Sequence, residues 1–448
     1  MPLFSSEKLK QIKAREAPAA NRPRVLLVDD EPANLRMMAA LLEREFELLE
    51  APDGQAAWEL IESLSESESL ACIVSDQRMP RLTGVELFER VHPVMPRVVR
   101  IIVTGFVDVD AIIDSINKAE IYKFIVKPFD ANDFKLTVRR AIEAHEMQRQ
   151  LDAYHRELEA HNTAFRRFVP GEFLQHLDRP NILEVQLGDN ALHDMTVLFA
   201  DIVDFSSLSE RMQPHEIFRF LNSYLSRIGP IVRSHNGFVD KYFGDGVMGL
   251  FPHSRKHALD AALEFRRDLV EYNAGRARAG YRPVDVGIGI HSGLLLLGTI
   301  GETERMDTTV IADGVNVASR LESLTRIYRT GIIVSANVVS RLSENDPYSL
   351  RPLGQVRVKG READVEIFEP FDADEPSLAE HKRRTAGDFV TALAAYQTGD
   401  FAAAGRLFEK IAALHPGDGP AAYYRARCTA LTLNAPAEWS GVDIFETK

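Results

Sequence analysis

The sequence contains almost no cysteine, which limits the kinds of protein it can encode. Its 448 residues include two cysteines, Cys72 and Cys428, which lie far apart in the chain. Two thiols are too few for a disulfide framework or for a zinc site built on cysteine. We therefore expect both to be buried as small hydrophobic side chains in a protein of a reducing compartment.

Long apolar segments and basic charge are also scarce. No stretch approaches the ~20 apolar residues that a membrane-spanning helix needs. The N-terminal segment MPLFSSEKLKQIKARE lacks the apolar run of a signal peptide. The formal net charge is −13, which leaves no basic stripe for nucleic acid. These absences predict a cytoplasmic protein with no membrane span and no nucleic-acid partner.

The length and the apolar patterning predict several domains. Residues 23–140 alternate short apolar runs with amphipathic stretches, which is typical of a doubly wound α/β domain with a parallel sheet. The runs expected to form strands are VLLVDD (25–30), LACIVSD (70–76), VVRIIVTG (98–105) and YKFIVKP (122–128).

A long helical segment without Gly or Pro follows from about residue 136 to 168, within a linker that we place at 141–192. Its apolar positions repeat in steps of four and three, which predicts a short parallel coiled coil, although an amphipathic helix packed on its own domain would show the same residues. These positions are Met147, Leu151, Tyr154, Leu158, His161, Phe165 and Phe168.

Two further regions complete the predicted organisation. Residues 193–370 mix strands and helices in a different order and predict an α+β domain. Residues 376–448 are rich in Ala and read as a small all-α tail, in which helix, GDF turn, helix, HPGD and helix follow the period of a tetratricopeptide unit. About one and a half units fit, so we expect the tail to pack on a neighbouring domain.

Charged and hydroxyl side chains follow the predicted strands of the first domain. Asp29 and Asp30 end the first strand, and Asp76, Thr104 and Lys127 end later ones. Ligands of such sheets collect at the carboxyl ends of the strands. Three carboxylates in one pocket repel one another unless a cation compensates, and Mg²⁺ is the hard cation that such oxygens prefer.

This constellation resembles the receiver domain of two-component response regulators over residues 23–140. The resemblance implies phosphorylation of Asp76 by an upstream histidine kinase or phosphotransfer protein, with Mg²⁺ bound at Asp29, Asp30 and Asp76. It also implies a switch formed by Thr104, Phe124 and Lys127. The alternative is a degenerate receiver that keeps the fold without phosphorylation.

A second pair of acids lies in the α+β region. FADIVDFS (199–206) places Asp201 at the end of an apolar strand, and KYFGDGVMGLF (241–251) places Asp245 in a turn between two glycines. Two aspartates on adjacent strands suggest a two-metal site, which suits in-line phosphoryl chemistry.

Together with GIGIHSG (287–293), TVIADGVNVASRL (309–321) and VRVKG (356–360), these segments resemble the catalytic domain of class III nucleotidyl cyclases over about residues 193–370. FRRFVPGEFLQHL (165–177) is similar to the transducing helix and turn that precede such domains. The resemblance implies a homodimer with two Mg²⁺ or Mn²⁺ ions in each site. It assigns metal binding to Asp201, Asp245 and the Ile202 carbonyl, base recognition to Lys241 and Thr309, ribose orientation to Asn316, and phosphate stabilisation to Arg320 and Lys359.

The base-reading pair favours ATP over GTP. A lysine ammonium only donates, which suits adenine N1, and a threonine hydroxyl accepts from the exocyclic amine. We therefore expect a phosphorylation-regulated adenylate cyclase. A guanylate cyclase, and a catalytically weak receiver–cyclase module that acts as a signalling or interaction protein, are the alternatives. The chain has no GG[DE]EF segment of a diguanylate cyclase and no P-loop.

Overall fold

The structure is a computed structural model that describes residues 22–64, 70–105, 120–165, 171–179, 181–210, 212–343, 346–358, 363–434, 436 and 438–445. The chain divides into two compact units, residues 1–163 and 164–448. Lys359, Phe168 and most of the FRRFV segment before residue 171 lie outside the described residues. Among the described helices, none combines the length and the apolar character needed to cross a membrane.

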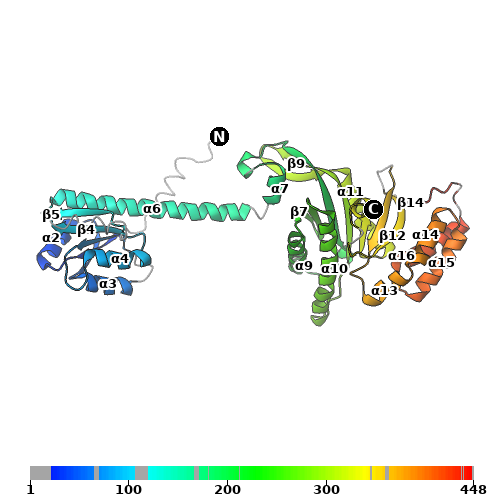
Figure 1. The fold of residues 1–448 in the computed structure, drawn as a ribbon, viewed down its shortest axis with the longest axis horizontal. Coiled ribbons are helices and arrows are strands. Elements are labelled where there is room, and N and C mark those ends of the chain that lie inside the picture. Colours follow the sequence, from blue (N-terminus) through cyan, green and yellow to red (C-terminus); the bar gives the residue numbers. More distant parts are fainter. Residues whose placement is uncertain are drawn as a thin grey trace. The chain divides into compact units, whose positions relative to one another are not determined.

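The first unit contains a parallel five-stranded sheet in the order β2-β1-β3-β4-β5, which confirms the doubly wound α/β prediction (Figure 1). The second strand of the chain, with the sequence ELLEA, was not among the predicted runs, because only its last residue is buried. The elements are β1 (Arg24–Val28), α2 (Pro32–Leu42), β2 (Glu47–Ala51), α3 (Gly54–Ser63), β3 (Cys72–Asp76), α4 (Gly84–Val94), β4 (Val99–Gly105), β5 (Lys123–Lys127) and α6 (Ala131–Phe165).

Alternate residues of each strand fill separate cores on the two faces of this sheet. Val25 and Leu27 of β1 pack with α2 and α6, whereas Leu26 and Val28 pack with α3 and α4. This alternation follows from the period-two geometry of a strand. Cys72 is buried in the first of these cores, as expected.

Helix α6 leaves the sheet and continues far beyond it. Its N-terminal half contributes Phe134, Val138 and Ile142 to the core. Beyond His145, the predicted coiled-coil stripe is exposed to solvent in the single chain, with Met147, Leu151, Tyr154, Leu158 and Phe165 between 49% and 73% exposed. Apolar side chains that stay exposed to water contribute no burial free energy to the fold. The coiled coil therefore remains a prediction, and it requires a second helix.

The second unit contains a mixed sheet in the order β14-β12-β13-β11-β9-β6-β8-β7, with β10 paired to β9. It supports the predicted α+β class. Its strands are β6 (Asn190–Ile202), β7 (Phe238–Phe243), β8 (Gly246–Phe251), β9 (Val286–Glu302), β10 (Arg305–Ile311), β11 (Ile332–Ser335), β12 (Leu350–Val358), β13 (Val365–Pro370) and β14 (Val442–Phe445). Its helices are α7 (Gly171–His176), η3 (Ile182–Glu184), α8 (Phe205–Ser209), α9 (Pro214–Ser234), α10 (Arg255–Arg278), α11 (Asp313–Tyr328), α12 (Ala336–Val339), α13 (Pro376–Arg384), α14 (Ala386–Gln397), α15 (Phe401–Leu414) and α16 (Gly419–Leu433).

Helix α11 packs directly on β9 because β9 carries glycines at the contact. A Cβ on Gly289 would overlap the Ala318 carbonyl oxygen and the Glu322 nitrogen, and one on Gly287 would overlap the Thr325 hydroxyl. The GIG part of the GIGIHSG segment is therefore a platform on which α11 lies unusually close to the sheet.

The C-terminal helices pack on the region of residues 193–370, as the small number of repeat units suggested. Helices α14, α15 and α16 share one core with α11, β12 and β13, and the N-terminus of α16 at Gly419 leaves no room for a Cβ beside the Tyr328 and Arg329 carbonyls. The tail is not all-α, because β14 adds a parallel strand to β12. The helix, turn and helix order agrees with the predicted pattern, whereas membership of the tetratricopeptide family remains a prediction.

Candidate active site and phosphoacceptor pocket

The first unit brings its predicted acids together at the carboxyl ends of β1 and β3. Asp29 and Asp76 are both buried, and Lys127 at the end of β5 bridges them. The Lys127 Nζ donates to Asp29 Oδ2 at 2.9 Å and to Asp76 Oδ1 at 2.5 Å. The second oxygen of Asp76 accepts from the Arg78 backbone N–H at 2.8 Å. Lys127 thus supplies the positive charge that the two carboxylates require.

Burial raises the pKa of Asp76 above its ordinary value, and the neighbouring Asp29 adds to this shift, although Lys127 opposes it. The same two carboxylates outweigh the effect of burial on Lys127 and raise the pKa of its ammonium. Asp30 is exposed beside the pocket. Carboxylate oxygens gathered in this way are a donor set that suits a hard cation such as Mg²⁺.

The predicted switch residues occupy different environments. Thr104 is buried at the end of β4, where its hydroxyl donates to the Gly105 carbonyl at 3.4 Å. Phe124 on β5 is 37% exposed. Of the three predicted switch residues, Lys127 therefore lies in the pocket, Thr104 is buried at the end of the neighbouring strand, and the Phe124 ring is partly accessible to solvent.

In the second unit, Asp201 and Asp245 lie side by side at the ends of adjacent strands. Asp201 is near the end of β6, and Asp245 is in the turn between β7 and β8, where Gly244 has a φ of +67°. The Ile202 N–H donates to Asp245 Oδ2 at 3.3 Å. A Cβ on Gly246 would stand 3.3 Å from Asp201 Oδ1, so the glycine keeps this carboxylate accessible.

Acidic side chains outnumber basic ones around this pair of aspartates. Burial, followed by the nearby Asp201 carboxyl, raises the pKa of Asp245 to about 7. Burial also raises the pKa of Glu322 on α11 to about 7, and both aspartates add to that shift. Three acidic groups in one region favour a bound cation.

The sequence interpretation missed one residue of this site. Arg326 on α11 donates to Asp201 Oδ2 at 2.8 Å and lies 3.1 Å from Glu322 Oε1. Arg326 is 125 positions from Asp201 in the sequence, and the packing of α11 on β9 brings the two side chains together. The Glu–Arg spacing of four residues on a helix was the available signal.

These residues fit the implied metal ions. Among the described residues, no group of three or more His, Cys, Asp or Glu side chains has the arrangement of a complete metal site. The predicted set consists of two carboxylates and one backbone carbonyl, which leaves the remaining positions to substrate oxygens and water. The Arg326 guanidinium stands where a cation would satisfy Asp201.

The predicted base-reading residues meet within one chain. The Lys241 Nζ on β7 donates to the Thr309 hydroxyl on β10 at 3.4 Å and to the Thr308 carbonyl at 3.3 Å. The segment RMDTTVI at residues 305–311 forms β10. The strand is what brings Thr309 opposite Lys241.

Asn316 and Arg320 lie one turn apart on α11, and neither has a hydrogen-bond or ion-pair partner among the described residues. Asn316 is exposed and Arg320 is half-buried. By contrast, His291 and Ser292 on β9 are buried and bonded to Ser335 and Thr196. These two residues have structural partners, whereas Asn316 and Arg320 are available to a ligand or a second chain.

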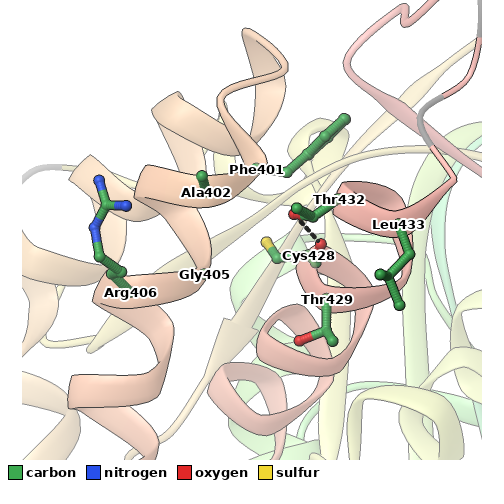
Figure 2. A pocket seen from close by; sticks show the side chains of 8 residues that line it. All are labelled: Phe401, Ala402, Gly405, Arg406, Cys428, Thr429, Thr432 and Leu433. Carbon is green, nitrogen blue, oxygen red and sulfur yellow. Dashed lines mark hydrogen bonds between the residues drawn. The ribbon is translucent and has the colours of Figure 1, made fainter.

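A separate cavity of about 290 Å³ lies between α15 and α16 (Figure 2). It is lined by side chains such as Phe401, Arg406, Cys428 and Leu433. Burial raises the pKa of the Cys428 thiol to about 11, so this cysteine is not a reactive thiolate. The cavity contains none of the predicted catalytic residues.

Comparison with known proteins agrees with the two predicted domains. Residues 188–369 match the adenylate and guanylate cyclase catalytic domain, and residues 25–139 match the response regulator receiver domain. The chain is 40% identical over 235 residues to an adenylate cyclase of Anabaena cylindrica, covering 51% of this chain and 47% of that protein. It is 30% identical over 268 residues to the terminal-differentiation specific adenylate cyclase of Dictyostelium discoideum, covering 58% of this chain and 12% of that protein.

Among solved structures, the adenylyl cyclase CyaB from P. aeruginosa is 31% identical over 41% of this chain and 96% of its own, with a TM-score of 0.37. The chain spans less than half of the length of the curated relatives named above. The similarity therefore concerns domains, and the activity of the whole protein must be argued from its own residues.

Proposed function

Because the chain contains a class III cyclase catalytic domain and an N-terminal receiver domain, we propose that it is an adenylate cyclase regulated by phosphorylation. It converts ATP to 3′,5′-cyclic AMP and pyrophosphate. The observation that carries this proposal is the pairing of Asp201 and Asp245 at adjoining strand ends, where burial and mutual repulsion raise the pKa of Asp245 to about 7.

In the reaction, the 3′-hydroxyl oxygen of the substrate forms a bond to its own α-phosphorus and loses its proton to water. The bond from that phosphorus to the oxygen that bridges to the β-phosphate breaks, and pyrophosphate leaves. Two divalent ions at Asp201, Asp245 and the Ile202 carbonyl would activate the attacking oxygen and neutralise the phosphates when bound. Asn316 orients the ribose, while Arg320 and Lys359 stabilise the charge that develops on the phosphates. Lys241 and Thr309 hold the base, and their 3.4 Å contact supports this pairing.

A homodimer is part of the proposal. Asn316 and Arg320 have no partner in their own chain among the described residues, and Asp201 is contacted there by Arg326 instead. Apolar side chains on the long strands β6, β9 and β10 are also exposed, including Leu192, Leu294 and Ile311 at 57% to 63%. We propose that a second copy covers these strands and that its Asn316 and Arg320 face the acids of the first.

Regulation follows from the position of the receiver domain. Phosphorylation of Asp76, from an upstream histidine kinase or phosphotransfer protein, would break the contact between Asp76 and Lys127 and alter the pocket next to Thr104. Helix α6 begins in the receiver core and ends with the exposed stripe. A change in how two such helices pair would therefore alter the closure of the two cyclase domains.

The experiment is a product assay on the purified full chain with Mn²⁺ and either ATP or GTP. We expect cyclic AMP from ATP and little product from GTP, and the Asp201→Asn variant should form no product while keeping its thermal unfolding midpoint. Cyclic GMP as the main product would replace this proposal by a guanylate cyclase. Absence of any cyclic product would instead favour a signalling or interaction module, and full activity of Asp201→Asn would contradict the site assignment.

A further inference from the structure

Strand β7 contains an irregularity next to the base-reading lysine. Val239 pairs with Gly249 of β8 and Lys241 pairs with Met248, so Asp240 has no partner of its own in the ladder. Two residues of one strand opposite one residue of its neighbour form a β-bulge, a device that redirects side chains and is common beside active sites. The bulge here brings Asp240 next to the Lys241 ammonium.

The buried carboxylate of Asp240 destabilises the folded state. Its side chain is fully buried, and neither of its oxygens has a hydrogen-bond partner among the described residues. Burial raises its pKa to about 6, with Lys241 opposing this shift and Asp307 adding to it. A buried carboxylate without donors destabilises a protein, so packing alone does not explain an acid at this position.

The closest cation to this carboxylate is its neighbour. The Lys241 Nζ lies 3.5 Å from Asp240 Oδ2, 3.3 Å from the Thr308 carbonyl oxygen and 3.4 Å from the Thr309 hydroxyl. The ammonium donates to the two Thr oxygens and pairs by charge with the carboxylate, so these three groups surround it. Of the three, the Thr309 hydroxyl can rotate and can itself bond to a base, whereas the Thr308 carbonyl is fixed in β10.

We propose that Asp240 is a positioning residue for base recognition. Its carboxylate and the Thr308 carbonyl hold two N–H groups of Lys241 and direct the third toward the base. When the nucleotide binds, the Thr309 hydroxyl turns from Lys241 to accept from the exocyclic amine of adenine, and the released N–H donates to ring N1. Guanine carries a donor at N1, so an ammonium held in this orientation rejects it.

This inference rests on the proposed function, because it assigns the base site of the same enzyme. A positioning role of Asp240 differs from a structural role in its effect on nucleotide affinity. A purely structural Asp240 would affect the stability of the fold and leave nucleotide affinity unchanged. A positioning residue changes affinity and base preference through Lys241.

The test measures equilibrium binding of 3′-deoxy-ATP and 3′-deoxy-GTP to the full chain by calorimetry, because neither nucleotide can cyclise. We expect Asp240→Asn to weaken binding of the adenine nucleotide by about tenfold and to reduce the preference over the guanine nucleotide, since one charge-assisted contact to Lys241 is lost. In a Lys241→Met background, Asp240→Asn should have no further effect.

Asp268→Asn is the matched control. Asp268 on α10 also has one buried oxygen without a partner, and its other oxygen accepts from Arg227 at 2.7 Å. It lies outside the base site, so its substitution should leave both affinities unchanged. A thermal unfolding scan of each variant confirms that it is folded.

Unchanged nucleotide affinities in folded Asp240→Asn would overturn the inference. An equal loss with and without Lys241 would also overturn it, because Asp240 would then not act through that lysine. If the wild-type chain binds 3′-deoxy-ATP but does not cyclise ATP, the proposed function fails and the inference stands. If the wild-type chain binds neither nucleotide, both are contradicted.

Discussion

Replacing Arg351 by methionine tests whether the C-terminal helices and the catalytic sheet form one folding unit. Arg351 on β12 is 1% exposed and lies over the Phe389 ring of α14. Its guanidinium donates to both oxygens of Asp418, at 2.7 and 2.8 Å, and to Glu369 on β13. Asp418 caps α16, so this side chain joins the tail to the sheet.

The expected loss is large because the substitution leaves buried charge behind. Both carboxylates are fully buried. Without Arg351, Glu369 keeps Lys382 at 2.9 Å and the Thr330 hydroxyl at 2.8 Å, and Asp418 keeps His381 at 3.2 Å. Removing one partner of a buried ion pair costs about 3–5 kcal/mol. We therefore expect the free energy of unfolding at pH 7 to fall by about 4 kcal/mol.

The stability difference between the wild type and Arg351→Met should depend on pH in a defined direction. Arg351 holds the pKa values of Glu369 and Asp418 below their ordinary values against the opposing effect of burial. In the wild type, this stabilisation is present above the unfolded-state pKa of a carboxyl group and is lost as the pH falls through the folded-state values. Without Arg351, burial dominates and the carboxyl groups become protonated at a higher pH. The stability difference between wild type and variant should therefore shrink as the pH falls from 7 toward 5.

The assay is urea unfolding at both pH values, followed by circular dichroism. Lys410→Met is the control, because Lys410 and Asp388 form an ion pair in which both side chains are about half exposed or more. Such a pair contributes less than about 1 kcal/mol. A loss of less than about 1 kcal/mol in Arg351→Met, or a difference that grows as the pH falls, would refute the reasoning.

Three further variants test the phosphoacceptor, the metal site and the coiled coil. Asp76→Asn should leave basal cyclase activity intact and abolish its response to a small phosphodonor, and a variant that still responds would exclude Asp76 as the phosphoacceptor. Arg326→Gln removes the cation that occupies Asp201, so Mn²⁺ measured by paramagnetic resonance should bind about fivefold more tightly, and weaker binding would contradict a competing role. Leu151→Glu combined with Leu158→Glu charges the exposed stripe of α6, so sedimentation should show a weaker dimer, whereas unchanged association would exclude the coiled coil.

Residues at the ends of parallel strands could be placed from the sequence. Asp29, Asp76 and Lys127 each follow an apolar run, and the geometry of a parallel sheet brings such positions to one edge. The structure confirms that Lys127 touches both acids. Asp201 and Asp245 meet for a different reason: Asp201 is near the end of β6, and Asp245 lies in the turn before β8, which pairs with β6 in the antiparallel direction.

Residues brought together by packing between elements could not be placed in this way. Arg326 reaches Asp201 across 125 positions of sequence, and this contact exists because glycines on β9 allow α11 to approach closely. The burial of Asp240 could not be predicted from the sequence, because it depends on a bulge in β7. Strand β14 is four residues long, too short for periodicity to reveal, so the tail was expected to be all-α.

Residues 305–311 form a strand because of their residue types and their pairing with β9. The segment is rich in β-branched residues, and its side chains alternate between the faces of a hairpin formed with β9. Short apolar runs with polar insertions fit either period, and pairing with a neighbouring strand decided between them. The strand also places Thr309 within reach of Lys241.

Complementation between two inactive variants is the most direct test of the claim that each site is shared by two chains. Asp201→Asn removes a metal ligand, and Arg320→Ala removes a phosphate-binding group that we assign to the opposite chain. Each variant alone should be inactive. After mixing and equilibration of equal amounts, half of the dimers carry one intact site, so about a quarter of the wild-type rate of cyclic AMP formation should return. A mixture no more active than its separate components would contradict the shared site.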